Sequence, residues 1–194
     1  MIFIQLMEIN TKLFYIINHN LQNSFFDFLM PMITDIGSMP FVLSICILLL
    51  VYSIITKNMS IKYLAITGII AILFTDIIIS ILKVLINEPR PFHTLTSVHL
   101  LISENDPYSF PSGHSGYIFA LAISLGLNWK FSIRKKEIKL LWLLIPLAFI
   151  VGFSRVYIGV HYPFDVFIGA IIGTIGGVIA TKIMSDYLTK NSNN

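Results

Sequence analysis

The 194-residue chain has little charge and almost no cysteine, and each shortage excludes a class of protein. Only 12% of its residues are charged, whereas a soluble globular domain carries about 25%. Hydrophobic residues make up 56% of the chain and are gathered in long runs, so the composition predicts an integral membrane protein. Cys46 is the only cysteine, which excludes an intramolecular disulfide, and its place in an apolar run indicates a small buried side chain.

Two further features of other protein classes are missing. The formal net charge of +3 is small and scattered, so nothing indicates a nucleic-acid partner. The first residues lack the basic start and the small-residue cleavage site of a signal peptide. Residues 1–17 and 25–36 are apolar but interrupted by polar side chains, and they are short for a bilayer, which needs about 20 residues. We therefore expect two interfacial or re-entrant helices within residues 1–38.

Apolar runs near the length of a membrane span occupy most of the remaining chain. They lie at residues 39–56, 62–86, 113–129, 139–156 and 163–187. The sequence therefore predicts an all-α integral membrane protein, in which about five transmembrane helices form a bundle behind the short N-terminal helices. We expect a transmembrane phosphate-handling domain over residues 39–187 and a polar C-terminal tail over residues 188–194.

Lysine and arginine are unevenly divided between the two sides of such a bundle. The 130–139 loop contains Arg134, Lys135 and Lys136, and with five spans it shares one side with the C-terminus. Basic loops tend to stay in the cytoplasm. We therefore expect a multi-pass protein of the plasma membrane, with the 87–112 loop on the outer face.

Three polar stretches interrupt the apolar runs, and all of them fall at span ends that this topology places outside. They are Lys83-x6-Arg90-Pro91, Pro111-Ser112-Gly113-His114 and Ser154-Arg155-x5-His161-x3-Asp165. Ionisable groups against membrane spans are costly and raise a functional hypothesis by default. Their shared face predicts one site at the outer membrane surface.

The last stretch has the arrangement of an activated nucleophile. Pro163 suits the first turn of a helix, where its missing N–H costs nothing, so His161 lies just before that helix and Asp165 in its first turn. The carboxylate can then accept a hydrogen bond from one imidazole nitrogen and leave the other free to attack. Arg155 adds a planar fork that matches phosphate oxygens. Taken alone, the stretch also fits a polar turn that caps a helix.

In this order, the three stretches resemble the three-part signature of the type 2 phosphatidic acid phosphatase family. The resemblance covers residues 83–165 by motif and most of the chain by its pattern of spans. It implies that His161 is a nucleophile that forms a phosphohistidine, with Asp165 to orient it. It also implies that His114 is the general acid that protonates the departing oxygen. The alternative for His114 is that it simply begins a helix.

The other polar residues of these stretches are expected to bind the phosphate. A phosphate ester repels nucleophiles through its negative charge, so an enzyme supplies cations and hydrogen-bond donors. The expected ligands are Lys83, Arg90, Arg155 and the backbone amides of Ser112 and Gly113. The two amides lie where the third span begins, with the helix dipole behind them.

Three more residues are candidates for accessory roles. Glu88 is expected to orient Arg90 or one of the substrate's phosphates. His93 lies in the long loop, where it would reach a head group, although exposed loop histidines are more often idle. Asp76 lies two helical turns deeper than Lys83 in an apolar run, and an internal hydrogen bond is favoured for it over direct catalysis.

We expect no metal and no cofactor at this site. Two histidines are present, but no second carboxylate or histidine follows at a ligand-like spacing. Three cations around the site would also repel a metal ion. The sequence thus predicts metal-independent hydrolysis.

The expected substrate is a lipid phosphate that reaches the site from the bilayer. Among the branches of the family, the chain resembles the short bacterial undecaprenyl-diphosphatases. The shared features are two short N-terminal helices, the string Glu88-Pro89-Arg90-Pro91-Phe92 and the loop leading to Ser109-Phe110-Pro111-Ser112. This resemblance implies hydrolysis of a polyprenyl diphosphate to the monophosphate. Gly113 stands where some such enzymes have Asp, so phosphatidylglycerophosphate or phosphatidate is the alternative substrate.

Two non-enzyme functions stay open from the sequence. A lipid transporter or scramblase needs polar positions across the membrane depth, whereas here they gather at one face. A catalytically inactive scaffold would have no need of the intact His114, His161 and Asp165. The sequence leaves the oligomeric state open.

Overall fold

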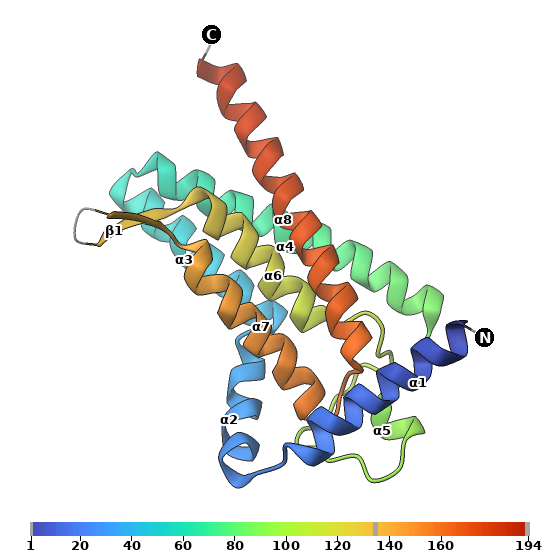
Figure 1. Ribbon diagram of the computed structural model, residues 1–194. Coiled ribbons are helices and arrows are strands. Elements are labelled where there is room, and N and C mark those ends of the chain that lie inside the picture. The colour runs from blue at the N-terminus through green and yellow to red at the C-terminus, as the bar shows by residue number, and fades with distance from the viewer. Residues whose placement is uncertain (1, 134–135, 193–194) are drawn as a thin grey trace.

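The computed structural model describes residues 2–133 and 136–192, and it is a helical bundle with one small hairpin (Figure 1). The helices are α1 (Ile2–Tyr15), the short π-helix η1 (Ile16–Asn20), α2 (Ser24–Asp35), α3 (Met39–Thr56), α4 (Met59–Ile86), α5 (Pro91–Thr94), α6 (Gly113–Asn128), α7 (Leu141–Tyr157) and α8 (Pro163–Ser192). The strands are β1 (Lys130–Ile133) and β2 (Lys136–Lys139). The all-α class predicted from the sequence is confirmed.

The five long helices lie where the apolar runs predicted them, although two of them are shorter than expected. Helices α3, α4 and α8 are long and apolar enough to cross a membrane. Helix α7 is apolar but has 17 residues, and α6 has only 16. The predicted bundle of about five apolar helices is confirmed, and α6 and α7 lie close to the predicted runs 113–129 and 139–156.

Helix α6 is short and weakly apolar because other helices enclose it. It lies against α4, α7 and α8 (Figure 1), and most of its residues are buried, including Ser115, Gly116 and Ser124. A helix without a lipid-facing side gains little from large apolar residues, whereas small residues let its neighbours approach closely. The low hydropathy of α6 therefore follows from its central place.

The glycines of α8 make one of these close approaches possible. A methyl group at Gly169 would collide with the carbonyl oxygen of Ser112, and one at Gly173 would collide with that of Gly116. At Gly177 a methyl would lie 2.7 Å from Cβ of Ile123. These three glycines thus serve the contact of α8 with α6 inside the bundle.

The outward faces of the long helices are apolar. Large side chains are exposed there, for example Leu48 on α3, Leu85 on α4, Trp142 on α7 and Phe167 on α8. A soluble monomer rarely exposes apolar surface on this scale. These faces suit lipid, and the protein is a membrane-embedded bundle.

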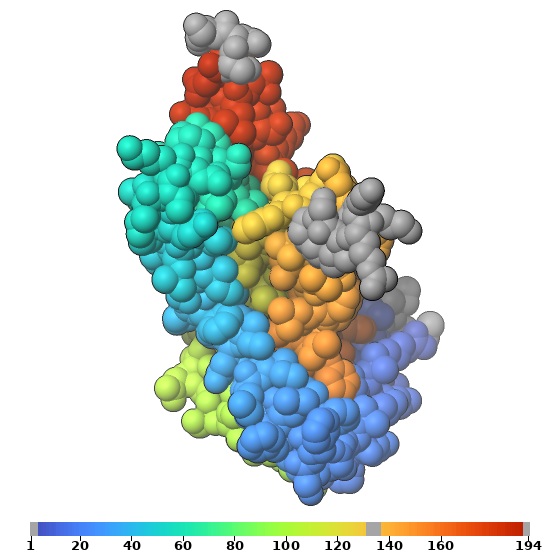
Figure 2. Space-filling model, turned by 90° about the vertical axis from the view of Figure 1, so that its left-hand side faces the viewer, coloured from blue at the N-terminus to red at the C-terminus, as the bar shows by residue number. Residues whose placement is uncertain are grey.

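The two N-terminal helices lie at one end of the bundle. In Figure 2, α2 is at that end and the C-terminal part of α8 projects at the other. The Asn10 side chain in α1 accepts a hydrogen bond from the amide of Phe164, at 3.0 Å. The Asn18 side chain in η1 donates to the carbonyl of Tyr157, at 2.8 Å. Both contacts hold the turn between α7 and α8. The position of α1 and α2 in the membrane interface stays a prediction, as do the domain limits given above.

The loop predicted between the third and fourth spans is an antiparallel hairpin. Strands β1 and β2 pair Lys130 with Lys139, and Lys130 forms a salt bridge with Glu137 at 3.0 Å. Arg134 and Lys135, two members of the predicted basic cluster, lie outside the described residues. The hairpin follows the C-terminus of α6, so it lies at the opposite end of that helix from His114.

Candidate active site

The three polar stretches meet at one end of the bundle. Lys83 lies in the last turn of α4, and Arg90 is the N-cap of α5. His114 lies in the first turn of α6, and Arg155 in the last turn of α7. The sequence predicted only that these residues share one face of the membrane. The structure shows that the motifs are in direct contact, for example between Arg90 and His161.

A tight turn between α7 and α8 presents His161. Helix α7 ends at Tyr157, and Gly159 then adopts a φ of 87°, which is favourable only for glycine. A side chain there would also lie 2.7 Å from the carbonyl oxygen of His99. Pro163 begins α8, as predicted, so His161 falls in the short segment between the two helices.

The hydrogen bonds of His161 define its tautomer. Its Nε2 lies 3.3 Å from Nη1 of Arg90, and its Nδ1 lies 3.2 Å from Oδ2 of Asp165. A guanidinium can only donate hydrogen bonds, so this network assigns the lone pair to Nε2 and the proton to Nδ1. The imidazole is therefore neutral, with its nucleophilic nitrogen directed toward the cations.

The pKa of His161 supports the neutral form. Burial lowers it well below its ordinary value of 6.5, and the positive charges of Arg155, Arg90 and Lys83 lower it further. Only 1% of the residue is exposed. His161 is thus a neutral imidazole that is shielded from water at neutral pH.

Asp165 is held by two more donors that the sequence did not predict. The hydroxyl of Ser109 and the backbone amide of Tyr162 both donate to its Oδ2, the latter at 2.8 Å. The same hydroxyl lies 3.4 Å from Nδ1 of His161. Ser109 was visible only as part of the loop that leads to Pro111, and nothing in its spacing indicated this contact.

The guanidinium of Arg90 bridges the nucleophile and an acidic loop. Besides its contact with His161, it donates from Nη1 to the carbonyl of Val160 at 2.9 Å. Its Nη2 lies 3.4 Å from Oδ2 of Asp106. Lys83 forms a shorter salt bridge with the same carboxylate oxygen, at 2.7 Å, and donates to the carbonyl of Tyr108 at 2.7 Å.

Arg155 is fully buried and reaches a second acid of that loop. Its Nη2 donates to Oε2 of Glu104 at 2.5 Å, and its Nη1 donates to the hydroxyl of Thr34 at 3.0 Å. Its Nε has no hydrogen-bond partner among the described residues. A buried donor of this kind is costly unless a ligand satisfies it.

Glu104 and Asp106 were missed by the sequence analysis. They are neither in the three motifs nor at a spacing that any helix pattern would single out. The available signal was their charge: they are acidic residues in the loop that leads directly to the second motif. Burial alone would raise the pKa of Asp106. Its bonds to Lys83 and to the Tyr108 amide outweigh that effect, so the pKa is lowered and the carboxylate stays ionised.

The amide of Ser112 is not free for a phosphate, which corrects one expectation. It donates to the backbone carbonyl of Asp165 at 3.0 Å and so ties the start of α6 to the start of α8. The amides of Gly113 and His114 have no acceptor within the described residues. These two amides at the N-terminus of α6 are the ones available to an anion.

Asp76 has the internal hydrogen bond that was expected. Its Oδ1 accepts a bond from the hydroxyl of Tyr117 at 2.6 Å. The ring of Tyr117 also covers Gly113, where an added Cβ would lie 3.2 Å from that hydroxyl. The pair therefore forms a polar layer directly beneath the start of α6.

The remaining candidate residues make fewer contacts with the site. The imidazole of His114 has no hydrogen-bond partner in the described part of the chain, so it is free for a substrate oxygen. Glu88 forms no ion pair with Arg90, and burial raises its pKa. His93 is exposed. His99, by contrast, lies 3.0 Å from Asp27, which makes it a link between the loop and α2.

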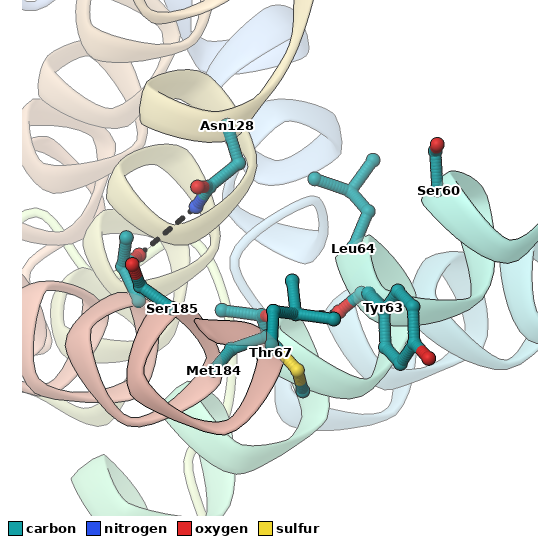
Figure 3. Close-up of a pocket in the computed structure, with 9 residues that line it drawn as sticks. Ser60, Tyr63, Leu64, Thr67, Asn128, Met184 and Ser185 are labelled. Carbon is teal, nitrogen blue, oxygen red and sulfur yellow. Dashed lines mark hydrogen bonds between the residues drawn. The ribbon is translucent and has the colours of Figure 1, made fainter. Parts of the chain in front are cut away.

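A separate hollow lies at the other end of the bundle (Figure 3). It has a volume of about 280 Å³ and is lined by residues of α4, α6 and α8 such as Tyr63, Asn128 and Ser185. The Asn128 amide spans it to the hydroxyl of Thr181 at 3.0 Å. It contains none of the residues of the three motifs. The described residues also hold no group of three or more His, Cys, Asp and Glu side chains that would suit a metal ion.

Comparison with known proteins assigns the family. Residues 63–188 match the PAP2 superfamily. The chain belongs to this superfamily. The resemblance seen in the three motifs is thereby confirmed, and the protein is a membrane phosphatase that hydrolyses phosphate esters.

The curated relatives include enzymes of one substrate class. The chain is 29% identical to the undecaprenyl-diphosphatase of Sulfolobus acidocaldarius, over 91% of this chain and 79% of the relative. It is 32% identical to the undecaprenyl-diphosphatase BcrC of Bacillus subtilis, over 81% of this chain and 74% of the relative. It is 36% identical to the bacitracin transport permease protein BcrC of Bacillus licheniformis, but over only 63% of this chain and 55% of that relative's length.

Two solved structures share the fold. LpxE of Aquifex aeolicus has a TM-score of 0.72 and 32% identity, and the match covers 90% of this chain and 95% of that chain. A PAP2-type phosphatidylglycerolphosphate phosphatase of Bacillus subtilis has a TM-score of 0.76 over 94% of this chain and 87% of that chain. Its identity is 18%, so it supports the fold alone.

Proposed function

We propose that this superfamily member hydrolyses a polyprenyl diphosphate of the undecaprenyl type to the monophosphate and inorganic phosphate, through a phosphohistidine on His161. The observation that carries the proposal is the Nε2 lone pair of a neutral histidine, directed at Arg90 within a cluster of three cations. The names of the Sulfolobus and Bacillus subtilis relatives support the substrate class.

In the first step, His161 displaces the lipid. The terminal phosphate lies on Arg90, Arg155 and the free amide of Gly113, which neutralise its oxygens. The Nε2 lone pair forms a bond to phosphorus, and the bond from phosphorus to the lipid-side oxygen breaks. His114 takes up a proton as the negatively charged phosphate enters the site, and it then donates this proton to that oxygen. Asp165 stabilises the positive charge that develops on the imidazole of His161.

In the second step, water releases the phosphate. His114, now neutral, takes a proton from water as the oxygen attacks phosphorus. The bond from phosphorus to Nε2 breaks, and its electron pair returns to the nitrogen of His161. Inorganic phosphate leaves, and both histidines regain their starting protonation states.

The charge of the site bears on the choice between a diphosphate and a phosphomonoester. Three cations exceed what one monoester needs, which favours a diphosphate whose second phosphate rests on Lys83. Glu104 and Asp106, however, neutralise two of these charges while the site is empty. A lipid phosphomonoester such as phosphatidylglycerophosphate or phosphatidate is therefore the second candidate.

Transport is the non-enzyme alternative, since one relative is named a transport permease. The ionisable side chains of the motifs gather at one end of the bundle, and the deepest acid, Asp76, is already bonded to Tyr117. A transporter site is expected nearer the bilayer midplane. Release of phosphate by the purified protein separates the two functions.

The test is a comparison of release rates in matched detergent micelles. Polyprenyl diphosphate, phosphatidylglycerophosphate and phosphatidate are each supplied to the purified protein, with His161→Ala as the control for contaminating phosphatases. We expect kcat/KM for the diphosphate to be higher by at least about tenfold, which is about 1.4 kcal/mol of transition-state binding. Faster hydrolysis of either phosphomonoester would refute the diphosphatase assignment and leave the family assignment intact.

The location of the site is the second part of the proposal. The basic hairpin would face the cytoplasm and the three motifs the outer surface, because Lys and Arg are retained inside. A lipid phosphate exposed at the outer leaflet would then enter directly from the bilayer.

A further inference from the structure

Two loop carboxylates contact all three cations of the site. Asp106 lies 2.7 Å from Nζ of Lys83 and 3.4 Å from Nη2 of Arg90. Glu104 forms the salt bridge with Arg155 and lies 4.0 Å from Nη1 of Arg90. Arg90 is therefore shared between the two acids. The carboxylate oxygens occupy the positions in which the cations would hold phosphate oxygens.

The arrangement is layered from the interior to water. Arg90, Arg155 and His161 are each 1% exposed, whereas the side chains of Glu104 and Asp106 are 21% and 40% exposed. The acids thus cover the buried cations and the nucleophile from the water side. A phosphate that binds Arg90 and Arg155 must therefore compete with these carboxylates for the guanidinium groups.

We propose that Glu104 and Asp106 form an acidic plug, a pair of internal anions that neutralises the cations of the empty site and that the substrate's phosphate displaces. The proposal rests on the phosphate-binding role of Lys83, Arg90 and Arg155 and not on the identity of the lipid. It makes the two acids specificity-determining residues of the phosphatase.

The plug has a physical reason. Buried guanidinium groups without an anion are costly and repel one another, so the empty site needs a counter-charge. Guanidinium groups bind carboxylates and phosphates with the same fork of donors. A terminal phosphate offers more charge and more oxygens than a carboxylate, and it can also reach Nε of Arg155, which the plug leaves without a partner.

The plug discriminates between incoming lipid head groups by their charge. A terminal phosphate carries close to two negative charges at neutral pH, since its second pKa is about 6. A phosphodiester head group of a bulk phospholipid carries one. The doubly charged group matches the total charge of the two carboxylates that it replaces, whereas the singly charged phosphodiester leaves one cation without a counter-charge. The plug would therefore keep abundant membrane lipids out of a strongly positive site.

The side chains can leave without opening of the loop. The backbone carbonyl of Asp106 accepts from Nε of Arg90, and that of Tyr108 accepts from Lys83. The amide of Ser109 donates to the carbonyl of Glu88 at 2.8 Å. These bonds hold the backbone in place, so rotation of the two acidic side chains toward water is sufficient to uncover the cations.

The experiment measures competitive inhibition by inorganic phosphate on the full-length protein in detergent. The variants are Glu104→Gln and Asp106→Asn, each of which keeps its side-chain shape and loses the charge. The matched control is Glu137→Gln, which removes an exposed carboxylate from a salt bridge on the hairpin. A competing internal anion raises the apparent dissociation constant in inverse proportion to the open fraction of the site. We therefore expect Ki to fall by about threefold to tenfold in both variants and to stay unchanged in the control.

If the acids only position the cations, Ki for phosphate changes in the opposite direction. If the acids only held Arg90 and Arg155 in place, their loss would raise Ki, and that result, or an unchanged Ki, overturns the plug. Thermal unfolding supplies a second measurement: saturating phosphate should raise Tm more in each variant than in the wild type, because only the variants lack an internal anion. An equal or smaller rise also overturns it.

Failure of the plug can be distinguished from failure of the site. In Arg155→Gln, the phosphate-dependent inhibition should weaken at least tenfold if the cations bind phosphate. If Arg155→Gln retains the Ki of the wild type, the proposed phosphate site is wrong. If it weakens while the two acid variants bind no tighter than the wild type, the site stands and the plug is refuted.

Discussion

At the scale of single residues, the site is organised around one imidazole. Asp165 and Arg90 contact opposite nitrogens of His161, and together they leave one uncharged tautomer with its lone pair toward the cations. Ser109 and the Tyr162 amide hold the carboxylate in turn. This arrangement is typical of an activated nucleophile. In the proposed mechanism the histidine is itself the nucleophile, and Asp165 orients it.

Removal of either histidine tests the assigned roles. His161→Ala should lower kcat by at least about a thousandfold, since no other described side chain offers a lone pair at that position. His114→Ala should cost more with poor leaving groups than with good ones, because a good leaving group needs little protonation. Phosphate release is measured for both variants on lipid and aryl phosphates, with circular dichroism as the folding control. Full activity of either variant on the lipid would refute its role.

The acid limb of the pH profile reports on His161. Burial, with help from the three cations, lowers its pKa below 6.5, and the neutral form is the reactive one. The acid limb of kcat/KM should therefore lie below pH 6.5, after correction for ionisation of the substrate phosphate near pH 6. The unfolded state binds this proton more tightly, so the stability contribution is full above about pH 6.5 and is lost as the pH falls through that value. An acid limb at or above pH 6.5 would contradict the assignment.

Ser109 should matter through Asp165. Ser109→Ala removes one of the donors to the carboxylate, which loosens the orientation of His161 without touching the cations. We expect kcat to fall about tenfold, the value of one charged hydrogen bond of about 1.4 kcal/mol, with KM nearly unchanged. Steady-state kinetics on the lipid substrate provide both values. Ser124→Ala, which removes a buried hydroxyl bonded within its own helix, is the control, and a similar loss there would assign the effect to general packing.

At the scale of the elements, α6 and α8 determine where the chemistry lies. Each of them has one candidate catalytic residue, His114 or Asp165, at its N-terminus, and the bond from the Ser112 amide to the Asp165 carbonyl joins those two ends. The close approach along the rest of their length depends on the glycines of α8. A shift of one helix along the other would move His114 relative to His161.

The helix contact gives a stability prediction. Gly173→Ala should destabilise the protein by about 1–3 kcal/mol, since its methyl group would collide with the backbone of Gly116 and neither helix can yield easily. Alanine is the better helix former, so intrinsic propensity predicts the opposite sign. Thermal unfolding in detergent gives the answer, with Val178→Ala at an exposed position of α8 as the control. A higher Tm for Gly173→Ala would show that the contact is not close.

At the scale of the whole molecule, the two ends of the bundle differ in character. One end holds the buried histidine, the cations and the N-terminal helices, and the other holds the basic hairpin and the hollow of Figure 3. This polarity is the basis for the proposed orientation. The apolar outer faces of the helices between them leave the lipid direct access to the site end.

Cysteine labelling tests that orientation. Cys46 is fully buried, and its replacement by serine gives a background without thiols. Ser103→Cys in the loop before the acidic plug should react with a membrane-impermeant reagent added outside, whereas Glu137→Cys on the hairpin should react only after permeabilisation. The reverse pattern would place the chemistry at the inner surface.

Much of this architecture can be predicted from local patterns in the sequence. The apolar runs determined the five long helices, Pro163 determined the start of α8, and the charged motifs indicated a phosphate site. Hydropathy predicted the bounds of α6 but not that other helices enclose it, because an apolar run does not show whether it faces lipid or other helices. The same limit applied to the Ser112 amide, whose acceptor lies in a different helix.

The family and the membrane class could be predicted from the sequence alone, because each is encoded in composition or in spacing along short segments, and the same motifs singled out His161 as the candidate nucleophile. The contacts between distant groups came only from the folded structure. Ser109 reaches Asp165 across 56 residues, and Glu104 reaches Arg155 across 51. Such contacts depend on how the loop folds over the helix ends, and no local propensity or hydrophobic period specifies that path. The acidic plug is therefore a property of the folded chain alone.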